Sequence, residues 1–173
     1  MDVPLMSDRP DADLLWFVGC AGAFDDRGKK ISKAMARVLQ RAEVKFAILG
    51  PEEACNGDLA RRAGNEYLAQ MLMQQNAEVF NQYKPKKILT GCPHCFNIIK
   101  NEYHQFDARY PVISHAELLF DLAQGGFVFG PGCGHLADQI LGGVLQFGLG
   151  LADAGHQRRI VADQHHADAE SEV

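Results

Sequence analysis

Four cysteines stand where their thiols can meet at one place in a fold. Each lies at or shortly after the end of a short apolar segment: Cys20, Cys55, Cys92 and Cys95. Thiolates are the usual ligands of iron–sulfur clusters and of many zinc sites. A fifth cysteine, Cys133, lies in a glycine-rich segment without a neighbouring strand signal, and we expect a free thiol there.

The most specific signal is the run Cys92-Pro93-His94-Cys95. Two cysteines separated by two residues at a helix start can chelate one ion, and the helix N-terminus favours the thiolate. Alone, the run is compatible with half of a metal site, a thioredoxin-like redox pair or coincidence. Because Cys20 and Cys55 are expected at the same place, we favour metal or cluster ligation by the four cysteines. Spacing alone does not separate an iron–sulfur cluster from zinc.

Other side chains near these cysteines have two interpretations each. His94 is either a solvent-facing helix residue or a partner that hydrogen-bonds a sulfur. Arg27 follows Asp25 and Asp26, which are expected to cap a helix, and it either belongs to that cap region or lies near the cluster. The pair Glu52-Glu53 is interpreted as a solvated loop segment.

The elements that must position the cysteines alternate along the chain. Apolar segments predict strands at 14–18, 44–49, 87–90 and 111–114, and helical spacing predicts helices at 27–42, 58–83, 93–103 and 116–124. The helix at 58–83 is expected to bury Leu59, Ala63, Tyr67, Leu68, Met71 and Leu72. This alternation predicts a three-layer α/β fold, with a mostly parallel sheet of about four strands and helices on both faces. Right-handed crossovers then bring all strand-to-helix loops, and the four cysteines, to one edge.

Composition narrows the classes of function. The 173-residue chain has 47% hydrophobic residues and a net charge of −5, which argues against nucleic acid as the main partner. No apolar run approaches the roughly 18 residues of a membrane span, and the first residues do not resemble a secretory signal. An odd number of cysteines without such a signal favours a reducing compartment, so we expect a cytoplasmic protein.

Three segments differ in composition. Residues 1–13 hold four aspartates and two prolines and are predicted to be a leader or linker. Residues 14–124 form the predicted α/β domain. Residues 125–173 are an atypical tail that is rich in glycine and histidine and has no lysine, a composition that allows partial disorder.

Four sequence blocks resemble, in order, one CCG-type cysteine-rich domain of the iron–sulfur oxidoreductases related to heterodisulfide reductase. The blocks are 18–25, 49–58, 61–67 and 92–97, and the resemblance covers about residues 14–122. Position by position, it places the family's cysteine ligands at Cys20, Cys55, Cys92 and Cys95.

This resemblance implies an electron-transfer module with an iron–sulfur cluster, expected to be [4Fe–4S], with zinc as the alternative. Family members pass electrons between a flavin or quinone partner and a disulfide or other acceptor. Expected partners are therefore other redox subunits, a second CCG domain or a ferredoxin-type domain, including those of a peripheral membrane complex. A single domain of this kind is expected to self-associate and not to catalyse a reaction alone.

The sequence departs from the family pattern in three ways. The paired cysteine of the second block is here Ala54-Cys55, no ferredoxin-type cysteine motif precedes the domain, and residues 126–173 resemble nothing in the family. Two alternatives therefore stay open beside the electron-transfer module. One is a structural zinc-binding or partner-docking domain, and the other is an inactive truncated fragment.

Overall fold

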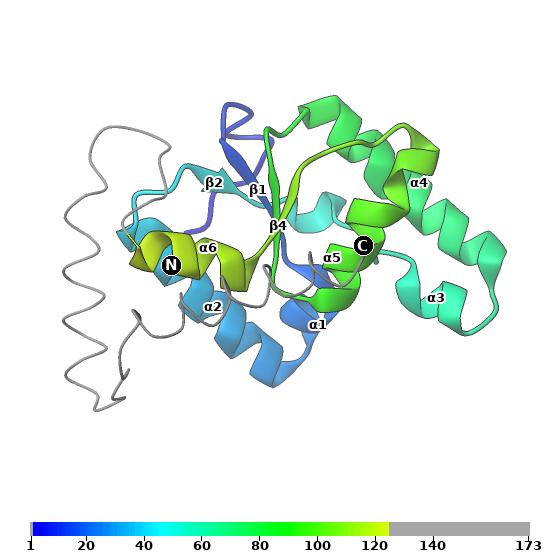
Figure 1. Ribbon diagram of the computed structural model, residues 1–173, viewed down its shortest axis with the longest axis horizontal. Helices are drawn as coiled ribbons and strands as arrows, with labels where there is room; N and C mark the ends of the chain where they lie inside the picture. The colour runs from blue at the N-terminus through cyan, green and yellow to red at the C-terminus, as the bar shows by residue number, and fades with distance from the viewer. Residues whose placement is uncertain (1, 125–173) are drawn as a thin grey trace, which may run out of the picture. The chain divides into compact units, whose positions relative to one another are not determined.

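A computed structural model describes residues 2–124, in which four strands lie between helices (Figure 1). The strands are β1 (Leu14–Phe17), β2 (Phe46–Ala47), β3 (Ile88–Thr90) and β4 (Val112–Ser114). They are arranged in the order β2-β1-β3-β4, and every neighbouring pair is parallel. The predicted α/β fold with a parallel four-stranded sheet is confirmed.

Helices connect the strands and follow the last one. They are α1 (Gly19–Phe24), α2 (Asp26–Arg41), α3 (Asp58–Arg62), α4 (Glu66–Tyr83), α5 (Pro93–Asn101) and α6 (His115–Ala123), with 3-10 turns at Gly50–Glu52 and Tyr103–Phe106. Asp25 caps α2 as expected, because its carboxylate accepts a hydrogen bond from the Gly28 N–H at 2.6 Å. Helix α1, which carries Cys20, was not part of the expectation, and of its residues only Gly19 is buried.

The core lies on both faces of the sheet, because successive side chains of a strand point to opposite sides. Leu15 and Phe17 of β1 belong to a cluster with buried residues of α4 and α5, such as Phe80 and Ile98. Leu14 and Trp16 belong to a second cluster with buried residues of α2 and α6: Met35, Ala36, Leu39, Leu118 and Leu122. The strands are therefore covered on both sides, which accounts for their continuous apolar sequences.

The single helix predicted at 58–83 is two helices. α3 ends at Arg62, Gly64 adopts a φ of +82°, and the Asn65 side chain caps α4 by accepting from the Leu68 N–H. The predicted apolar face is also wrong, since Leu59, Tyr67, Leu68 and Met71 are exposed. α4 instead buries Ala69, Met73, Asn76, Ala77 and Phe80.

The N-terminal segment packs against the sheet edge beside β2. Leu5 forms a parallel bridge with Ile48, and Met6, whose side chain is fully buried, donates its N–H to the Ile48 carbonyl. The segment expected as a leader or linker therefore contributes part of this edge. Cys133 and the predicted tail at 125–173 lie outside the described residues.

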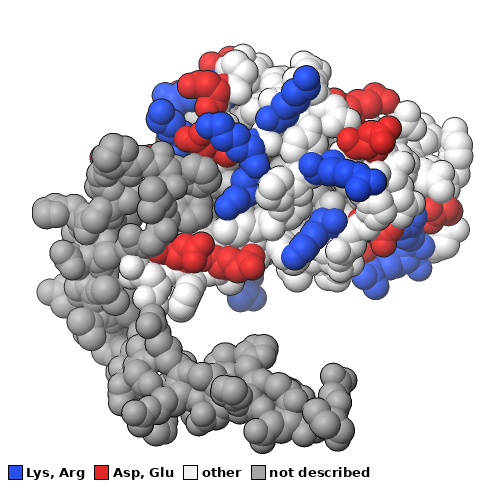
Figure 2. All heavy atoms as spheres, turned by 45° about the horizontal axis from the view of Figure 1, so that its top comes forward, with Lys and Arg blue, Asp and Glu red and all other residues white. Residues whose placement is uncertain are grey.

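The surface carries charges of both signs. On the face seen in Figure 2, Lys and Arg side chains lie among Asp and Glu side chains. Arg61 pairs with Glu66 and Glu102 and so ties α3 to the start of α4 and to the end of α5. Of the helices in residues 2–124, none has the length and apolar character needed to cross a bilayer.

Candidate functional site

The strand order brings two cysteine loops together at the carboxyl edge of the sheet. From β1 the chain crosses to β2 on one side, and it later returns to β3 on the other side of β1. Phe17 and Thr90 are register partners in β1 and β3, and Cys20 and Cys92 follow them closely. Open α/β sheets bind ligands at such a point, where successive connections diverge.

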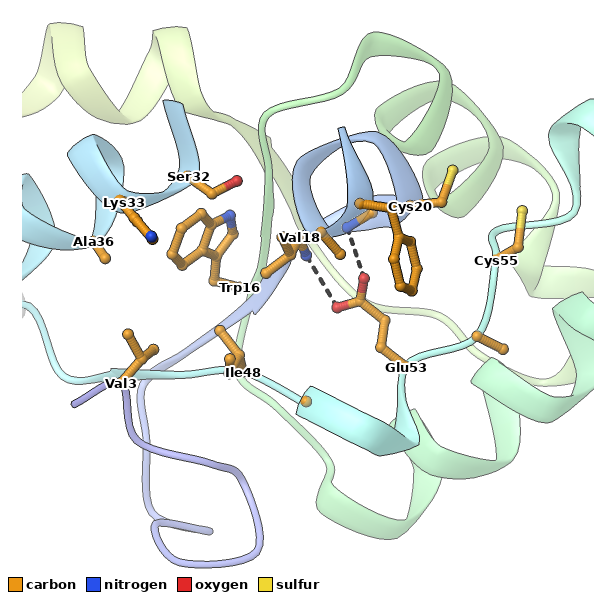
Figure 3. A pocket seen from close by; sticks show the side chains of 15 residues that line it. Val3, Trp16, Val18, Cys20, Ser32, Lys33, Ala36, Ile48, Glu53 and Cys55 are labelled. Atoms are coloured by element: carbon orange, nitrogen blue, oxygen red, sulfur yellow. Dashed lines mark hydrogen bonds between the residues drawn. The ribbon is translucent and has the colours of Figure 1, made fainter. Parts of the chain in front are cut away.

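Cys20 and Cys55 form the more open pair of thiols. Cys20 lies in the first turn of α1 and is exposed, whereas Cys55 lies in the loop before α3 and is half-buried. Figure 3 shows the two thiols on the same side of the neighbouring loops, pointing in a similar direction. Partial burial, and then the nearby Cys55 thiol, raises the pKa of Cys20. This thiol is therefore protonated near neutral pH unless a cation stabilises its charge.

Cys92 and Cys95 form the more enclosed pair, at the start of α5. Cys92 is the N-cap residue of α5 and is half-buried, whereas Cys95 is only 3% exposed. Burial, and then the neighbouring Cys92 thiol, raises the pKa of Cys95. Gly19 approaches this pair from α1: a Cβ at its position, where φ is +77°, would lie 3.2 Å from Cys95 Sγ. The absent side chain at Gly19 thus allows the Cys20 loop to approach Cys95.

One buried amide lies between the two pairs. Asn56 Nδ2 donates a hydrogen bond to Cys95 Sγ at 3.0 Å, and Cys55 Sγ lies 3.8 Å from Asn56 Oδ1. Oδ1 also accepts from the Asp58 N–H at 2.9 Å. Asn56 therefore links the loop after β2 to the cysteine run after β3.

A second buried amide holds the Cys55 segment against α4. Asn76 Oδ1 accepts from the Ala54 N–H at 3.0 Å, and Nδ2 donates to the Ala54 and Cys55 carbonyls. Nδ2 also lies 3.2 Å from the hydroxyl of Tyr103, which in turn donates to the Asn56 carbonyl. Both side chains are fully buried. These contacts fix the backbone on both sides of Cys55.

Glu53 ties the Cys55 loop to the Cys20 loop. Its carboxylate accepts from the Val18 N–H at 3.0 Å and from the Gly19 N–H at 2.6 Å. Burial raises the pKa of Glu53 to about 7, although the two backbone donors favour the charged form. The interpretation of Glu52-Glu53 as a solvated pair is therefore wrong for Glu53, since its carboxylate is aimed at the turn that begins α1.

A pocket of about 300 Å³ opens beside Cys20 and Cys55 (Figure 3). Its walls are mostly apolar and include Trp16, Val18, Ala36 and Ile48, while Ser32, Lys33 and Glu53 supply its polar groups. This volume is at the lower end of the range for small-molecule sites. The thiols lie at one end of the pocket, and Lys33 lies toward the other (Figure 3).

The four thiols do not converge on one point as they stand. Within residues 2–124, no three Cys, His, Asp or Glu side chains are grouped closely enough to hold a metal ion. The donor chemistry nevertheless fits a thiolate-bound metal or cluster. All four thiols are free, and Asn56 and Gly19 make contacts between the two pairs. Ligation by all four would require the open pair to approach the enclosed pair.

Residues 14–100 match one family of known proteins, CCG, described as a cysteine-rich domain. The chain belongs to the CCG cysteine-rich domain family. The resemblance inferred from the four sequence blocks is thereby confirmed. Comparison with solved structures gave no significant match.

Several curated proteins are similar to this chain over part of their length. The EtfAB:quinone oxidoreductase of Syntrophomonas wolfei subsp. wolfei is 47% identical over 122 residues, which are 70% of this chain and 17% of that protein. "Probable iron-sulfur-binding oxidoreductase FadF" of Bacillus subtilis is 42% identical, with the same two shares. One subunit of the dihydromethanophenazine:CoB–CoM heterodisulfide reductase of Methanosarcina barkeri is 31% identical, over 65% of this chain and 29% of that subunit. The chain thus spans less than a third of the length of each of these relatives.

The structure places the remaining candidate residues of the CCG domain as follows. His94 is exposed on α5, and its Nδ1 lies 3.9 Å from Cys92 Sγ. Arg27 is exposed in the first turn of α2, and within the described residues its side chain has no hydrogen bond or ion pair. A role for either residue beside a cluster stays a prediction.

Sequence reasoning missed the polar side chains that support the cysteines. These are Glu53, Asn56, Asn76, Thr90 and Tyr103. Only Asn56 had a local signal, because the sequence Asn56-Gly57-Asp58 is typical of a turn in which an asparagine side chain bonds the backbone two residues on.

Proposed function

We propose that this CCG domain is the electron-transfer module of an iron–sulfur oxidoreductase and binds a cluster through Cys20, Cys55, Cys92 and Cys95. The observation that carries the proposal is that four free thiols from three segments lie in two pairs at the carboxyl edge of the sheet, with Asn56 in contact with one sulfur of each pair. The names of the relatives support it, because they include an iron-sulfur-binding oxidoreductase and a heterodisulfide reductase subunit.

The side chains around the thiols suit this role. The N-terminus of α5 favours negative charge at Cys92 and Cys95. The Asn56 amide and the Thr90 hydroxyl stabilise charge on Cys95 in its buried position. Glu53 and Asn76 hold the backbone beside Cys20 and Cys55, so that two thiols from separate loops would become fixed ligands.

A bound cluster would supply a one-electron redox centre, and four thiolates are the usual ligand set of the [4Fe–4S] type. The protein determines how that centre behaves through hydrogen bonds to sulfur, burial and exposure. Here Cys95 is buried and Cys20 is exposed. The proposed centre would therefore have one side in the protein interior and one side facing a partner.

A structural zinc site is the second candidate function. It is favoured by Ala54, which stands where the family pattern has a second cysteine, and four thiolates are also a common structural zinc site. Zinc has no redox chemistry, so this candidate would make the domain a scaffold for a partner.

We further propose that the domain works with other redox domains or subunits, at a membrane surface or in the cytoplasm. Exposed apolar side chains near the thiols support a docking role, since Phe24 is 80% exposed and Leu59 is 73% exposed. One relative is named an EtfAB:quinone oxidoreductase, and electron exchange with a quinone-linked partner is therefore part of the proposal.

The test is reconstitution of the full chain with iron and sulfide under anaerobic conditions. Wild type and Cys133→Ser should both give broad visible absorption, whereas Cys92→Ser should lose most of it because a hydroxyl is a poor ligand for a soft metal. Circular dichroism should show that all three proteins are folded. Equal loading of the Cys92→Ser variant would overturn the assignment of the site.

A further inference from the structure

Within residues 2–124, the Asn56 side chain contacts a sulfur atom of each cysteine pair. Its Nδ2 is 3.0 Å from Cys95 Sγ, and its Oδ1 is 3.8 Å from Cys55 Sγ. The side chain is buried, at 7% exposure, and so is Cys95, at 3%. A donor so placed acts on the sulfur with little competition from water.

The orientation of this amide is fixed by its surroundings. The Asp58 N–H can only donate, so the atom 2.9 Å from it must be the oxygen of the Asn56 side chain. The NH₂ group must then face Cys95. The Asn56 carbonyl accepts from the Tyr103 hydroxyl at 3.2 Å, and Asn76 bonds that hydroxyl in turn. The donor is therefore held in place before anything binds.

The chemistry at Cys95 requires such a donor. A thiolate that binds a metal or cluster carries negative charge, and at this buried position water supplies few hydrogen bonds to it. The Thr90 hydroxyl also favours the charged form of this thiol. A bound cluster becomes more negative when it is reduced, so a fixed N–H donor stabilises its reduced state more than its oxidised state.

We propose that Asn56 is a positioning residue that raises the reduction potential of the centre bound at Cys95, through its N–H···S hydrogen bond. The inference rests on the proposed function, because it concerns a bound redox centre. It goes further by naming the side chain that sets the potential and the sulfur through which it acts.

The test compares three variants of the full chain after reconstitution. Asn56→Asp keeps the acceptor for the Asp58 N–H and replaces the donor with an oxygen. Asn56→Leu removes the donor without adding charge. Asn97→Asp is the control: it adds the same charge on the exposed face of α5, where Asn97 bonds only Asn101. Iron content and circular dichroism are measured first, and the midpoint potential follows by redox titration.

Both Asn56 variants should have a lower potential than wild type, with Asn56→Asp the lower of the two and Asn97→Asp close to wild type. For Asn56→Asp we expect at least a tenfold smaller ratio of reduced to oxidised centre at a fixed potential, which is about 59 mV for one electron. If the wild type binds a cluster and both Asn56 variants have the wild-type potential, this inference is overturned while the proposed function stands. Folded Asn56 variants that take up no iron also overturn it, since Asn56 would then be needed for assembly. A wild type that takes up no iron contradicts the proposed function, and this inference falls with it.

Discussion

Asn76 is expected to be the most important buried polar side chain for the Cys55 loop, and Asn76→Ala tests this. The side chain is fully buried and has hydrogen bonds to the Ala54 N–H, to the Ala54 and Cys55 carbonyls and to the Tyr103 hydroxyl. Alanine leaves the Ala54 N–H and the Ala54 and Cys55 carbonyls without this partner in a place that water reaches poorly, whereas the Tyr103 hydroxyl still donates to the Asn56 carbonyl. Each buried group that loses its partner costs about 1 kcal/mol or more, so the loss should be about 3 kcal/mol.

The assay is chemical denaturation of the metal-free chain under reducing conditions, followed by circular dichroism. Gln74→Ala is the matched control, since Gln74 lies on the exposed face of the same helix and bonds only Glu78. The control should stay within about 0.5 kcal/mol of wild type. Domains of this kind are stable by about 5–15 kcal/mol, so Asn76→Ala should remain folded and measurable.

Two further measurements separate the hydrogen bonds from simple loss of volume. Asn76→Asp keeps the size of the side chain and the acceptor for the Ala54 N–H. It replaces the NH₂ group that faces two carbonyls with a carboxylate oxygen or, when protonated, with a single hydroxyl. This variant should therefore be at least as unstable as Asn76→Ala. Tyr103→Phe combined with Asn76→Ala should show a coupling of about 0.5 kcal/mol or more, because the two side chains share one network. An Asn76→Ala variant that loses less than about 1 kcal/mol would refute the reasoning.

Three other predictions concern pH, size and association. Burial raises the pKa of Glu53 from 4.5 to about 7, so this carboxyl group binds its proton more tightly in the folded metal-free chain than in the unfolded chain. Proton binding at Glu53 therefore contributes on the order of 3 kcal/mol to the free energy of unfolding. This contribution is fully present below pH 4.5 and is lost as the pH rises through 7. Stability measured between pH 5 and 8 should fall less steeply in Glu53→Gln, and a slope equal to that of wild type would contradict the assigned burial. A chain ending at Gln124 should unfold cooperatively on heating, since α6 already packs Leu118 and Leu122 into the core; a gradual transition would show that later residues are needed. The same shortened chain should self-associate at tens of micromolar through the exposed Tyr67 and Met71. In sedimentation, a Tyr67→Lys/Met71→Lys variant of this chain should associate less. Equal association of the two would place the contact elsewhere.

The strands could be predicted from the sequence because both of their faces are buried, which leaves continuous apolar runs such as 14–18. The buried face of helix α4 was harder to predict, because two stripes of apolar residues run along the helix. One stripe contains Tyr67, Leu68 and Met71, and the other contains Ala69, Met73 and Phe80. The second stripe is buried although it includes Asn76, because small alanines and this asparagine allow close packing against the Cys55 loop. The local periodicity of the sequence gives no information about that long-range contact.

The placement of the four cysteines at the carboxyl edge of the sheet could likewise be predicted from their position after the strands, but the side chains that contact their segments could not. Glu53 bonds residues 34 and 35 positions away, and Asn56 bonds a sulfur 39 positions away. A glutamate in a loop and an asparagine in a turn are usually solvated, so only the fold reveals that these two are enclosed.

The proposed function requires that the four cysteines bind an iron–sulfur cluster. The most direct test is the iron, sulfide and zinc content of the chain isolated under anaerobic conditions, without reconstitution. We predict about four iron and about four sulfide per chain, with only traces of zinc. One zinc per chain with no iron would contradict the claim and select the structural zinc site.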